Sequence, residues 1–339
     1  MPIRLIDVFL PEAHADLVDS ALEDREIMGV WRETPSEGLV HVQVLVETIH
    51  AEGVLDDLER CLAGVKDYRI VIMPVVASIP RPEPPKEQEK EEEEKHHERP
   101  SLRISREELY AQIQGMVQLT PIYMVLVILS AIVAAIGLMR DSPAVVIAAM
   151  VIAPMLGPNM GLSLSAALAD WPLGVRALRT AVVGIVTALL FSLLAGRVIG
   201  VNMSAVEFSS RTQASLGDVA LALASGIAGA LAFTTSAATW LVGVMVAVAL
   251  LPPLVTCGML LGRGHWTPAS GALLLFLTNV ICVNLAAVGT FVAQGIRPRT
   301  WWEASKARRA TRIALAIWGA MLVLLVILIL LWQRFRAGP

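Results

Sequence analysis

The chain has 339 residues, of which 55% are hydrophobic and 17% charged, and its mean hydropathy is +0.64. This composition is typical of an integral membrane protein and excludes an ordinary soluble enzyme. The formal net charge of −3 gives no reason to expect nucleic-acid binding. Cys61, Cys257 and Cys282 lack the spacing of metal ligands, so we expect no metal site, no cofactor and no disulfide framework.

Residues 1–78 have the pattern of a small soluble domain. Four strands, at 4–10, 27–34, 39–50 and 68–76, alternate with helices at 13–24 and 51–63. This βαββαβ order predicts a ferredoxin-like domain, which could regulate, sense a ligand, hold an oligomer together or serve as a passive cap. Because Met1–Leu10 carries charge and alternates like a strand, we expect no cleavable signal peptide and a cytoplasmic domain.

A linker at 79–100 separates this domain from the rest of the chain. It is rich in proline and then in Glu, Lys and His, a composition that cannot bury a core. Residues 101–120 predict an amphipathic helix lying on the membrane surface, opened by Ser105 and Glu108 as a capping box. Its apolar stripe contains Leu109, Ile113, Met116 and Val117.

Seven apolar segments follow, each long enough to cross a bilayer. We place them near 121–139, 142–169, 178–199, 216–235, 239–261, 267–293 and 312–332. Six form a transmembrane core at 121–296, and the seventh follows a basic loop within 297–339. Ten arginine and lysine residues flank the spans on the same side as the N-terminus, and six flank them on the opposite side. This excess favours a cytoplasmic N-terminus in the inner (plasma) membrane.

Prolines and glycines interrupt the second span near its middle, at Pro154, Gly157 and Pro158. Each proline removes a backbone donor and disfavours a helical residue before it. A helix broken at this depth survives only inside protein or facing a water-filled cavity. Asn159 adds polar groups to the same place.

The fifth span carries a similar interruption at Pro252 and Pro253, followed by Thr256. Residues 121–199 and 216–293 each hold three spans with proline in the second, which predicts a 3+3 inverted repeat. Paired broken helices are typical of a transporter site, although kinked structural helices would give the same pattern. Uncharged polar residues in the sixth span, Thr278, Asn279 and Asn284, complete the candidate site for a small solute or ion.

The first six spans contain almost no ionisable side chain, so no nucleophile–base pair or metal cluster is available at membrane depth. An intramembrane enzyme is therefore not expected. The asparagines and hydroxyls can equally act as hydrogen-bonding contacts between packed helices. Small residues four apart, such as Gly157 and Gly161, predict close helix packing.

Several segments together resemble a family of bacterial and archaeal hydrophobic membrane proteins known as domain of unknown function three-eight-nine. They are the segments 142–147, 150–158, 250–254 and 275–279. The resemblance covers about residues 119–295 and implies a multi-span protein, often with an appended soluble domain. It implies no activity. Asn159 stands where the resemblance leads us to expect an apolar residue, so a role for it would belong to this chain.

Two hypotheses of function follow. The first is a secondary transporter or channel-like permease, with its site between the two proline-containing helices and with homo-oligomers held by the soluble domain. The second is a membrane scaffold or sensor that transports nothing and whose soluble domain binds a ligand or partner. A lipid-handling protein, open sideways to the bilayer, is a third.

Overall fold

A computed structural model gives the arrangement of the chain. It describes residues 3–75 except 24 and 37, residue 78, residues 104–235 except 200 and 202, residues 239–296 and residues 301–336. The predicted linker lies almost wholly outside the described residues. The chain divides into two compact units, Met1–Leu109 and Tyr110–Pro339, which are described separately.

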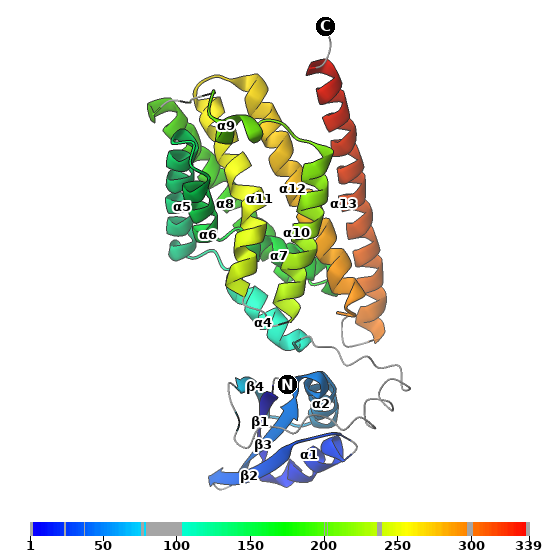
Figure 1. Ribbon diagram of the computed structural model, residues 1–339. Coiled ribbons are helices and arrows are strands. Elements are labelled where there is room, and N and C mark those ends of the chain that lie inside the picture. Colours follow the sequence, from blue (N-terminus) through cyan, green and yellow to red (C-terminus); the bar gives the residue numbers. More distant parts are fainter. Residues whose placement is uncertain are drawn as a thin grey trace. The chain divides into compact units, whose positions relative to one another are not determined.

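The first unit contains a four-stranded antiparallel sheet with two helices packed on one side (Figure 1). Its elements, in the order βαββαβ, are β1 (Ile3–Pro11), α1 (Ala15–Leu22), β2 (Gly29–Ser36), β3 (Leu39–Glu47), α2 (Thr48–Leu62) and β4 (Arg69–Val75), with a 3-10 turn η1 (Glu12–His14) before α1. The strands lie in the order β2-β3-β1-β4, which is the ferredoxin-like arrangement that the sequence predicts.

Alternation along the two central strands builds the core of this domain. Val40, Val42, Val44 and Val46 on β3 are buried against the helices, as predicted from their period of two. Alternate residues of β1 join them, with Val54, Leu58 and Leu62 from α2. Gly38 turns the β2–β3 hairpin with a φ of +83°, a conformation that favours glycine.

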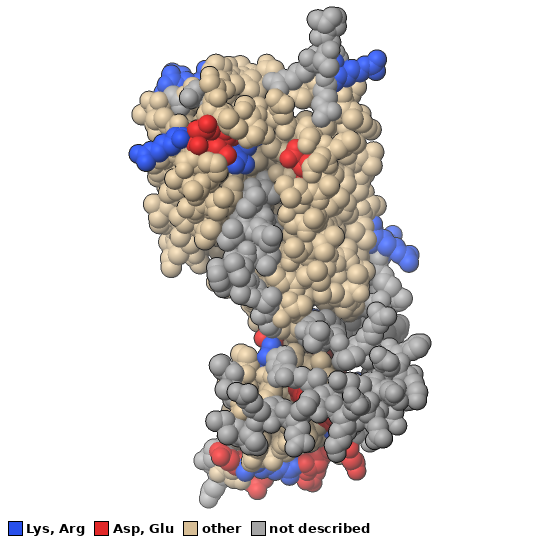
Figure 2. All heavy atoms as spheres, in the orientation of Figure 1, with Lys and Arg blue, Asp and Glu red and all other residues tan. Residues whose placement is uncertain are grey.

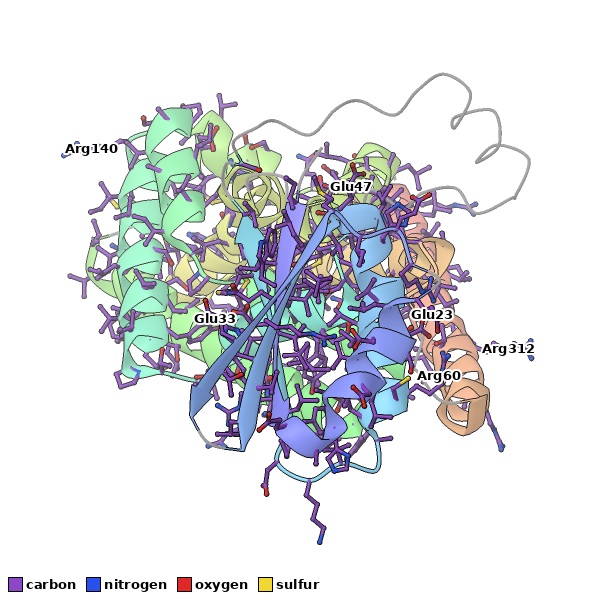
Figure 3. The ribbon with its side chains drawn as sticks, turned by 90° about the horizontal axis from the view of Figure 1, so that it is seen from below. Glu23, Glu33, Glu47, Arg60, Arg140 and Arg312 are labelled. Carbon is purple, nitrogen blue, oxygen red and sulfur yellow. The ribbon has the colours of Figure 1, made fainter. Side chains whose placement is uncertain are left out.

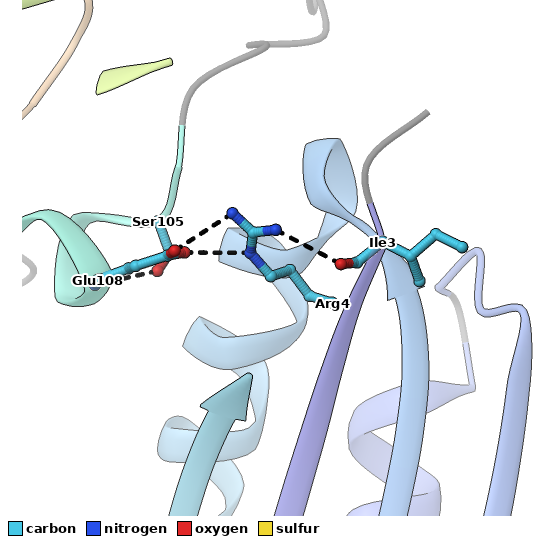
Figure 4. Close-up of polar contacts among 4 residues, drawn as sticks. All are labelled: Ile3, Arg4, Ser105 and Glu108. Carbon is cyan, nitrogen blue, oxygen red and sulfur yellow. Dashed lines mark hydrogen bonds and ion pairs between the residues drawn. The ribbon is translucent and has the colours of Figure 1, made fainter. Parts of the chain in front are cut away.

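The helix α4 (Arg106–Met116) begins in the first unit, where its first turn is tied to β1 (Figure 4). The Ser105 hydroxyl accepts a hydrogen bond from the Glu108 N–H at 3.2 Å, which is one half of the predicted capping box. The Glu108 carboxylate instead accepts two hydrogen bonds from the guanidinium of Arg4, at 3.1 and 3.2 Å. Arg4 is only 4% exposed, so this paired contact satisfies a buried charge.

The second unit is a bundle of long apolar helices. They are α5 (Pro121–Met139), α6 (Pro143–Ile152), α7 (Leu156–Leu168), α8 (Trp171–Ile199), α10 (Leu216–Thr234), α11 (Thr239–Gly262), α12 (Trp266–Ala293) and α13 (Trp301–Arg336), with a short α9 (Val206–Ser210). Helix α12 contacts α7, α10, α11 and α13 and is the most buried of the five helices that are long enough to cross a membrane, whereas α13 is largely exposed.

Five of these helices are long and apolar enough to cross a membrane, and the bent pair α6–α7 would make six. Their outer faces carry exposed apolar side chains such as Ile122, Val198 and Val323. Figure 2 shows the visible side of this unit as a broad uncharged surface with its charged residues towards the ends. Together these features indicate a membrane-embedded protein.

Two expectations about these helices need correction. The basic residues after the sixth span do not all lie in a loop, because Lys306, Arg308, Arg309 and Arg312 fall within α13. The apolar stripe of α4 is also not free to lie on lipid, since Ile113 and Val117 are fully buried. They pack against α7, where a Cβ added at Gly161 would overlap Val117.

We predict that Gly258→Val in α11 lowers the free energy of unfolding by about 1–3 kcal/mol. A Cβ at this position would overlap the Ser192 hydroxyl and lie 2.9 Å from the carbonyl oxygen of Leu189, so α8 and α11 would be forced apart. The matched control is Gly289→Val in α12, where a Cβ would have no atom within 4 Å. Thermal unfolding in detergent checks this, and equal midpoints for the two variants would contradict it.

Candidate functional site

The candidate site surrounds the break between α6 and α7, where the helix axis bends by 53°. Ala153, the residue before Pro154, is extended with a ψ of 118°, because proline disfavours a helical residue before it. Pro158 lies in the first turn of α7, where its missing N–H would have had no helical partner. The predicted break is therefore present, and proline chemistry accounts for both of its ends.

The second predicted break is wrong, since α11 runs as one helix from Thr239 to Gly262 with Pro252 and Pro253 inside it. Each proline removes one backbone hydrogen bond. Membrane helices tolerate this loss when neighbouring groups satisfy the freed carbonyls. Both prolines are buried, and α11 is packed along α8 and α12, which holds the helix together through the defect.

A buried polar cluster joins α7 to α12 one turn after the break. The Asn284 amide nitrogen donates to the Asn159 side-chain oxygen and to the Val280 carbonyl, each at 2.8 Å. The Ser163 hydroxyl lies 3.1 Å from the side-chain oxygen of Asn284 and 3.0 Å from the Asn159 carbonyl. Asn159 in turn donates to the carbonyl of Met155, inside the break, at 2.8 Å.

This cluster contains no ionisable side chain, and its three members are at most 6% exposed. Any interaction with a solute or ion would therefore use amide and hydroxyl dipoles. Of the predicted site residues, the structure brings together Asn159 and Asn284, which are 125 positions apart in the chain.

A small pocket opens beside Asn159, between the start of α7 and its neighbours. Nine residues line it: Tyr123, Met155, Pro158, Asn159, Ala181, Ile185, Leu250, Phe276 and Val280. The space open to the centre of a water molecule is about 10 Å³, which suffices for about one water. The lining is mostly apolar. Asn159 is its main polar side chain that makes no hydrogen bond to the backbone of a neighbouring helix.

The remaining predicted residues lie outside this pocket. Pro154 and Gly157 form the break, and Gly157 is packed so closely on Met116 of α4 that an added Cβ would lie 2.6 Å from the Met116 Cβ. Thr278 donates to the carbonyl of Leu274 on its own helix, and Asn279 is 5% exposed. Neither contributes to the lining of the pocket.

Thr256 is unusual among the buried hydroxyls. It is fully buried in α11, and its Oγ1 has no hydrogen-bond partner within the part of the chain that the structure describes. Other helical threonines of this unit, Thr278 and Thr290, bond to the carbonyl four residues earlier. At Thr256 that carbonyl belongs to Pro252, in the proline pair.

Two further hydrogen bonds, not predicted from the sequence, join α5 to α8 and α8 to the residue that follows α4. Tyr123 donates to the Thr180 carbonyl at 3.2 Å, and the Thr180 hydroxyl donates to the Val117 carbonyl at 2.7 Å. A tyrosine near the start of an apolar span was the available signal, since a buried phenol normally finds a partner.

At the turn between α7 and α8, Tyr110 donates to the Asp170 carboxylate at 2.7 Å, and the same carboxylate caps α8 through the Leu173 N–H. Burial, followed by the hydrogen bond and charge of Asp170, raises the pKa of Tyr110 above its usual value. The phenol therefore remains a hydrogen-bond donor throughout the physiological pH range.

Comparison with known proteins assigns the chain to a family. A relative from Methanocaldococcus jannaschii, itself uncharacterised, is 34% identical over 332 residues, which cover 97% of this chain and 99% of the relative. Residues 150–285 also match the family described as a domain of unknown function (DUF389). The chain belongs to the DUF389 family. No solved structure matches it.

The region that matches DUF389 contains the candidate site. It begins at Met150, in the last turns of α6, and ends at Leu285, directly after Asn284. The matched region thus contains the break, the polar cluster and the proline pair of α11. The resemblance noted from the sequence is confirmed, and the similarity to the archaeal relative extends beyond it to the soluble domain.

We predict that Asn159 and Asn284 are energetically coupled by about 0.6–1.7 kcal/mol, the range measured for hydrogen bonds between membrane helices. Asn159→Leu and Asn284→Leu each leave a buried polar group unpaired, whereas the double variant removes both. Thermal unfolding of the two single variants and the double variant in detergent measures the coupling.

The control for this cycle pairs Asn159→Leu with Thr278→Val, because Thr278 bonds only within its own helix. The effect of Thr278→Val on the free energy of unfolding should add to that of Asn159→Leu. Strict additivity in the Asn159–Asn284 cycle would contradict the cross-helix bond.

We also predict that Thr256→Val leaves the protein as stable or raises the free energy of unfolding by up to about 1 kcal/mol, since a buried hydroxyl without a partner is destabilising. The matched variant Thr278→Val removes a hydroxyl that has a partner and should not stabilise. The unfolding midpoints of Thr256→Val and Thr278→Val, each compared with that of the unaltered protein, test this prediction. A larger loss for Thr256→Val than for Thr278→Val would contradict the assignment.

Proposed function

We propose that this DUF389 protein is a membrane permease for a small ion or uncharged solute, and that its path passes the α6–α7 break. The observation that carries the proposal is the buried contact between Asn159 and Asn284, next to a broken span. Breaking a helix at this depth is costly, so breaks are retained where they serve a binding or transport site.

The chemistry of the cluster supports a hard cation or a neutral, hydrogen-bonding solute. Amide and hydroxyl oxygens are the ligands that Na⁺ and similar ions accept, and no charged side chain competes for them. An anion is less well served, because the start of α7 is packed against Met116.

The packing of the bundle supports seven spans and a paired architecture. The seven are α5, α6–α7, α8, α10, α11, α12 and α13. Helix α8 of the first half packs on α11 of the second, and α7 of the first half packs on α12 of the second. A pseudo-two-fold axis that relates α8 to α12 and α6–α7 to α11 would turn each of these contacts into the other, as an inverted repeat requires. The excess of basic residues near one set of loops supports an N-terminus on the cytoplasmic side.

The break also supplies a hinge. Its two halves have different neighbours, since α6 packs on α5 and α11, whereas α7 packs on α8, α12 and α13. A pocket with room for about one water corresponds to a closed state of such a permease. A movement of α6 against α7 at Ala153–Met155 would widen the pocket. Such a movement is possible because not all backbone groups of these three residues make helical hydrogen bonds.

We predict that proteoliposomes containing the full chain take up radiolabelled sodium ions, neutral amino acids or small uncharged solutes faster than empty liposomes. Asn159→Leu should reduce the rate of the transported probe about tenfold or more, because about 1.4 kcal/mol of favourable contact would be lost in the path. The measurement is uptake against time for each probe at equal protein content.

The control is Thr290→Val, which alters a half-buried hydroxyl on α12 that bonds only to Ala286. It should transport like the unaltered protein. Absence of uptake for every probe, or an Asn159→Leu variant with the unaltered rate, would contradict the proposed path.

A scaffold or sensor without transport is the second candidate, and one observation favours it. The polar cluster satisfies its own hydrogen bonds, and the adjacent pocket is small. On this alternative the cluster specifies how α7 and α12 pack, and the soluble domain carries the function. Failure of the uptake experiment together with the predicted Asn159–Asn284 coupling would favour this candidate.

A further inference from the structure

The sheet of the soluble domain has one face that its own helices leave open. The strand register places the open-face residues in rows that cross the sheet from β2 to β4. One row is Glu33, His41, Phe9 and Arg69; the next is Trp31, Gln43, Asp7 and Val71; and the third is Gly29, Leu45, Leu5 and Met73. These three rows are called the open face below.

The open face exposes more apolar surface than a solvated sheet normally does. Trp31 is 52% exposed, Met73 40% and Phe9 37%. The Phe9 and His41 rings stack at 4.3 Å with an interplanar angle of 7°, which gives the middle of the first row a flat surface. Such a combination marks a contact surface rather than a face turned to water.

Opposite charges stand at the two edges of the open face. Glu33 lies on the edge strand β2 and Arg69 on the edge strand β4, in the same row and both exposed. Three strand spacings, about 14 Å, separate these edges, so the two side chains of one chain cannot meet each other. Figure 3 shows Glu33 and Glu47 on the strand side of the domain, whereas Glu23 and Arg60 lie on the helix side.

We propose that the open face binds the open face of a second copy of this chain, about a two-fold axis parallel to the strands. Such an axis lays β2 of one copy over β4 of the other. Glu33 then meets Arg69 of the second copy, and Arg69 meets Glu33 of the second copy. The interface therefore contains two such pairs of opposite charge. A two-fold axis across the strands would instead place β2 on β2 and β4 on β4, so Glu33 would not meet Arg69.

The other rows complement each other under the same axis. In the third row Gly29, which has no side chain, faces Met73 of the second copy. The Trp31 ring covers Gly29, since a Cβ added there would lie 2.7 Å from the ring, so the Met73 sulfur and methyl group of the second copy meet an aromatic surface. In the middle row Gln43, which donates to Asp7 at 3.0 Å within its own sheet, faces the second copy's Asp7.

A second copy is favoured over another partner because the face is complementary to itself. It carries one acidic edge, one basic edge and an aromatic middle in which the Asp7 carboxylate is already held by Gln43 and His41 of its own sheet, which is the pattern of an isologous interface. Anchoring through the apolar helices also confines all copies to the same plane, so an interface of modest area is sufficient. This inference is independent of transport and holds equally for a scaffold.

The experiment uses full-length chains in lipid nanodiscs that accept two copies, with donor or acceptor fluorophores at the N-terminus. Energy transfer between copies reports the pairing of the soluble domains. Glu33→Arg alone and Arg69→Glu alone should each lower the transfer at least about threefold, because each creates two like-charge contacts. A mixture of Glu33→Arg donors with Arg69→Glu acceptors should restore the transfer of the unaltered protein, because every contact then joins opposite charges.

Restoration in the mixture also shows that both variants fold, since they are the same two proteins. The matched controls are Glu23→Arg and Arg60→Glu, the same charge reversals on the helix side, which should leave the transfer unchanged. Unaltered transfer in both single variants would overturn the proposal, because the open face would then be outside the contact. Continued low transfer in the mixture would overturn it as well, because the axis would not pair β2 with β4.

Discussion

Polar groups placed inside an apolar bundle must find partners within the protein, and this constraint shapes the whole second unit. Pro154 separates α6 from α7 and leaves polar backbone groups inside the apolar bundle. The side chain of Asn159 takes up the carbonyl of Met155 in that break. It is itself held by Asn284 from α12, so a neighbouring, largely buried helix stabilises the break between α6 and α7.

The same constraint explains why the two proline sites differ. At Pro154 the chain leaves the helix, bends by 53° and restarts, because Pro158 also fits only in a first turn. At Pro252 and Pro253 the prolines are adjacent, so the missing donors fall together and α11 continues as a helix. Near the proline pair, the buried hydroxyl of Thr256 has no partner within the described residues.

The two units follow different physical rules. The soluble domain is held by a core of alternating valines, and its remaining apolar surface is gathered on one face between two charged edges. The helical unit is held by close approach of backbones, as at Gly196 and Gly258, and by a few cross-helix hydrogen bonds. The open face of the first unit and the polar break of the second can therefore be altered separately.

The sequence by itself determined the order of the elements and some of their bounds, because hydrophobic period and proline position are local properties, although α8 and α13 extend beyond the predicted spans. The βαββαβ domain, α5, α10 and the break after Ile152 all follow from such patterns. Only the tertiary structure decided which polar residues meet. Nothing local distinguishes Asn284, which bonds to Asn159 across the bundle, from Thr278, which bonds within its own helix. Whether a proline pair breaks a helix, and whether the stripe of α4 faces lipid or protein, also depends on neighbours far away in the chain.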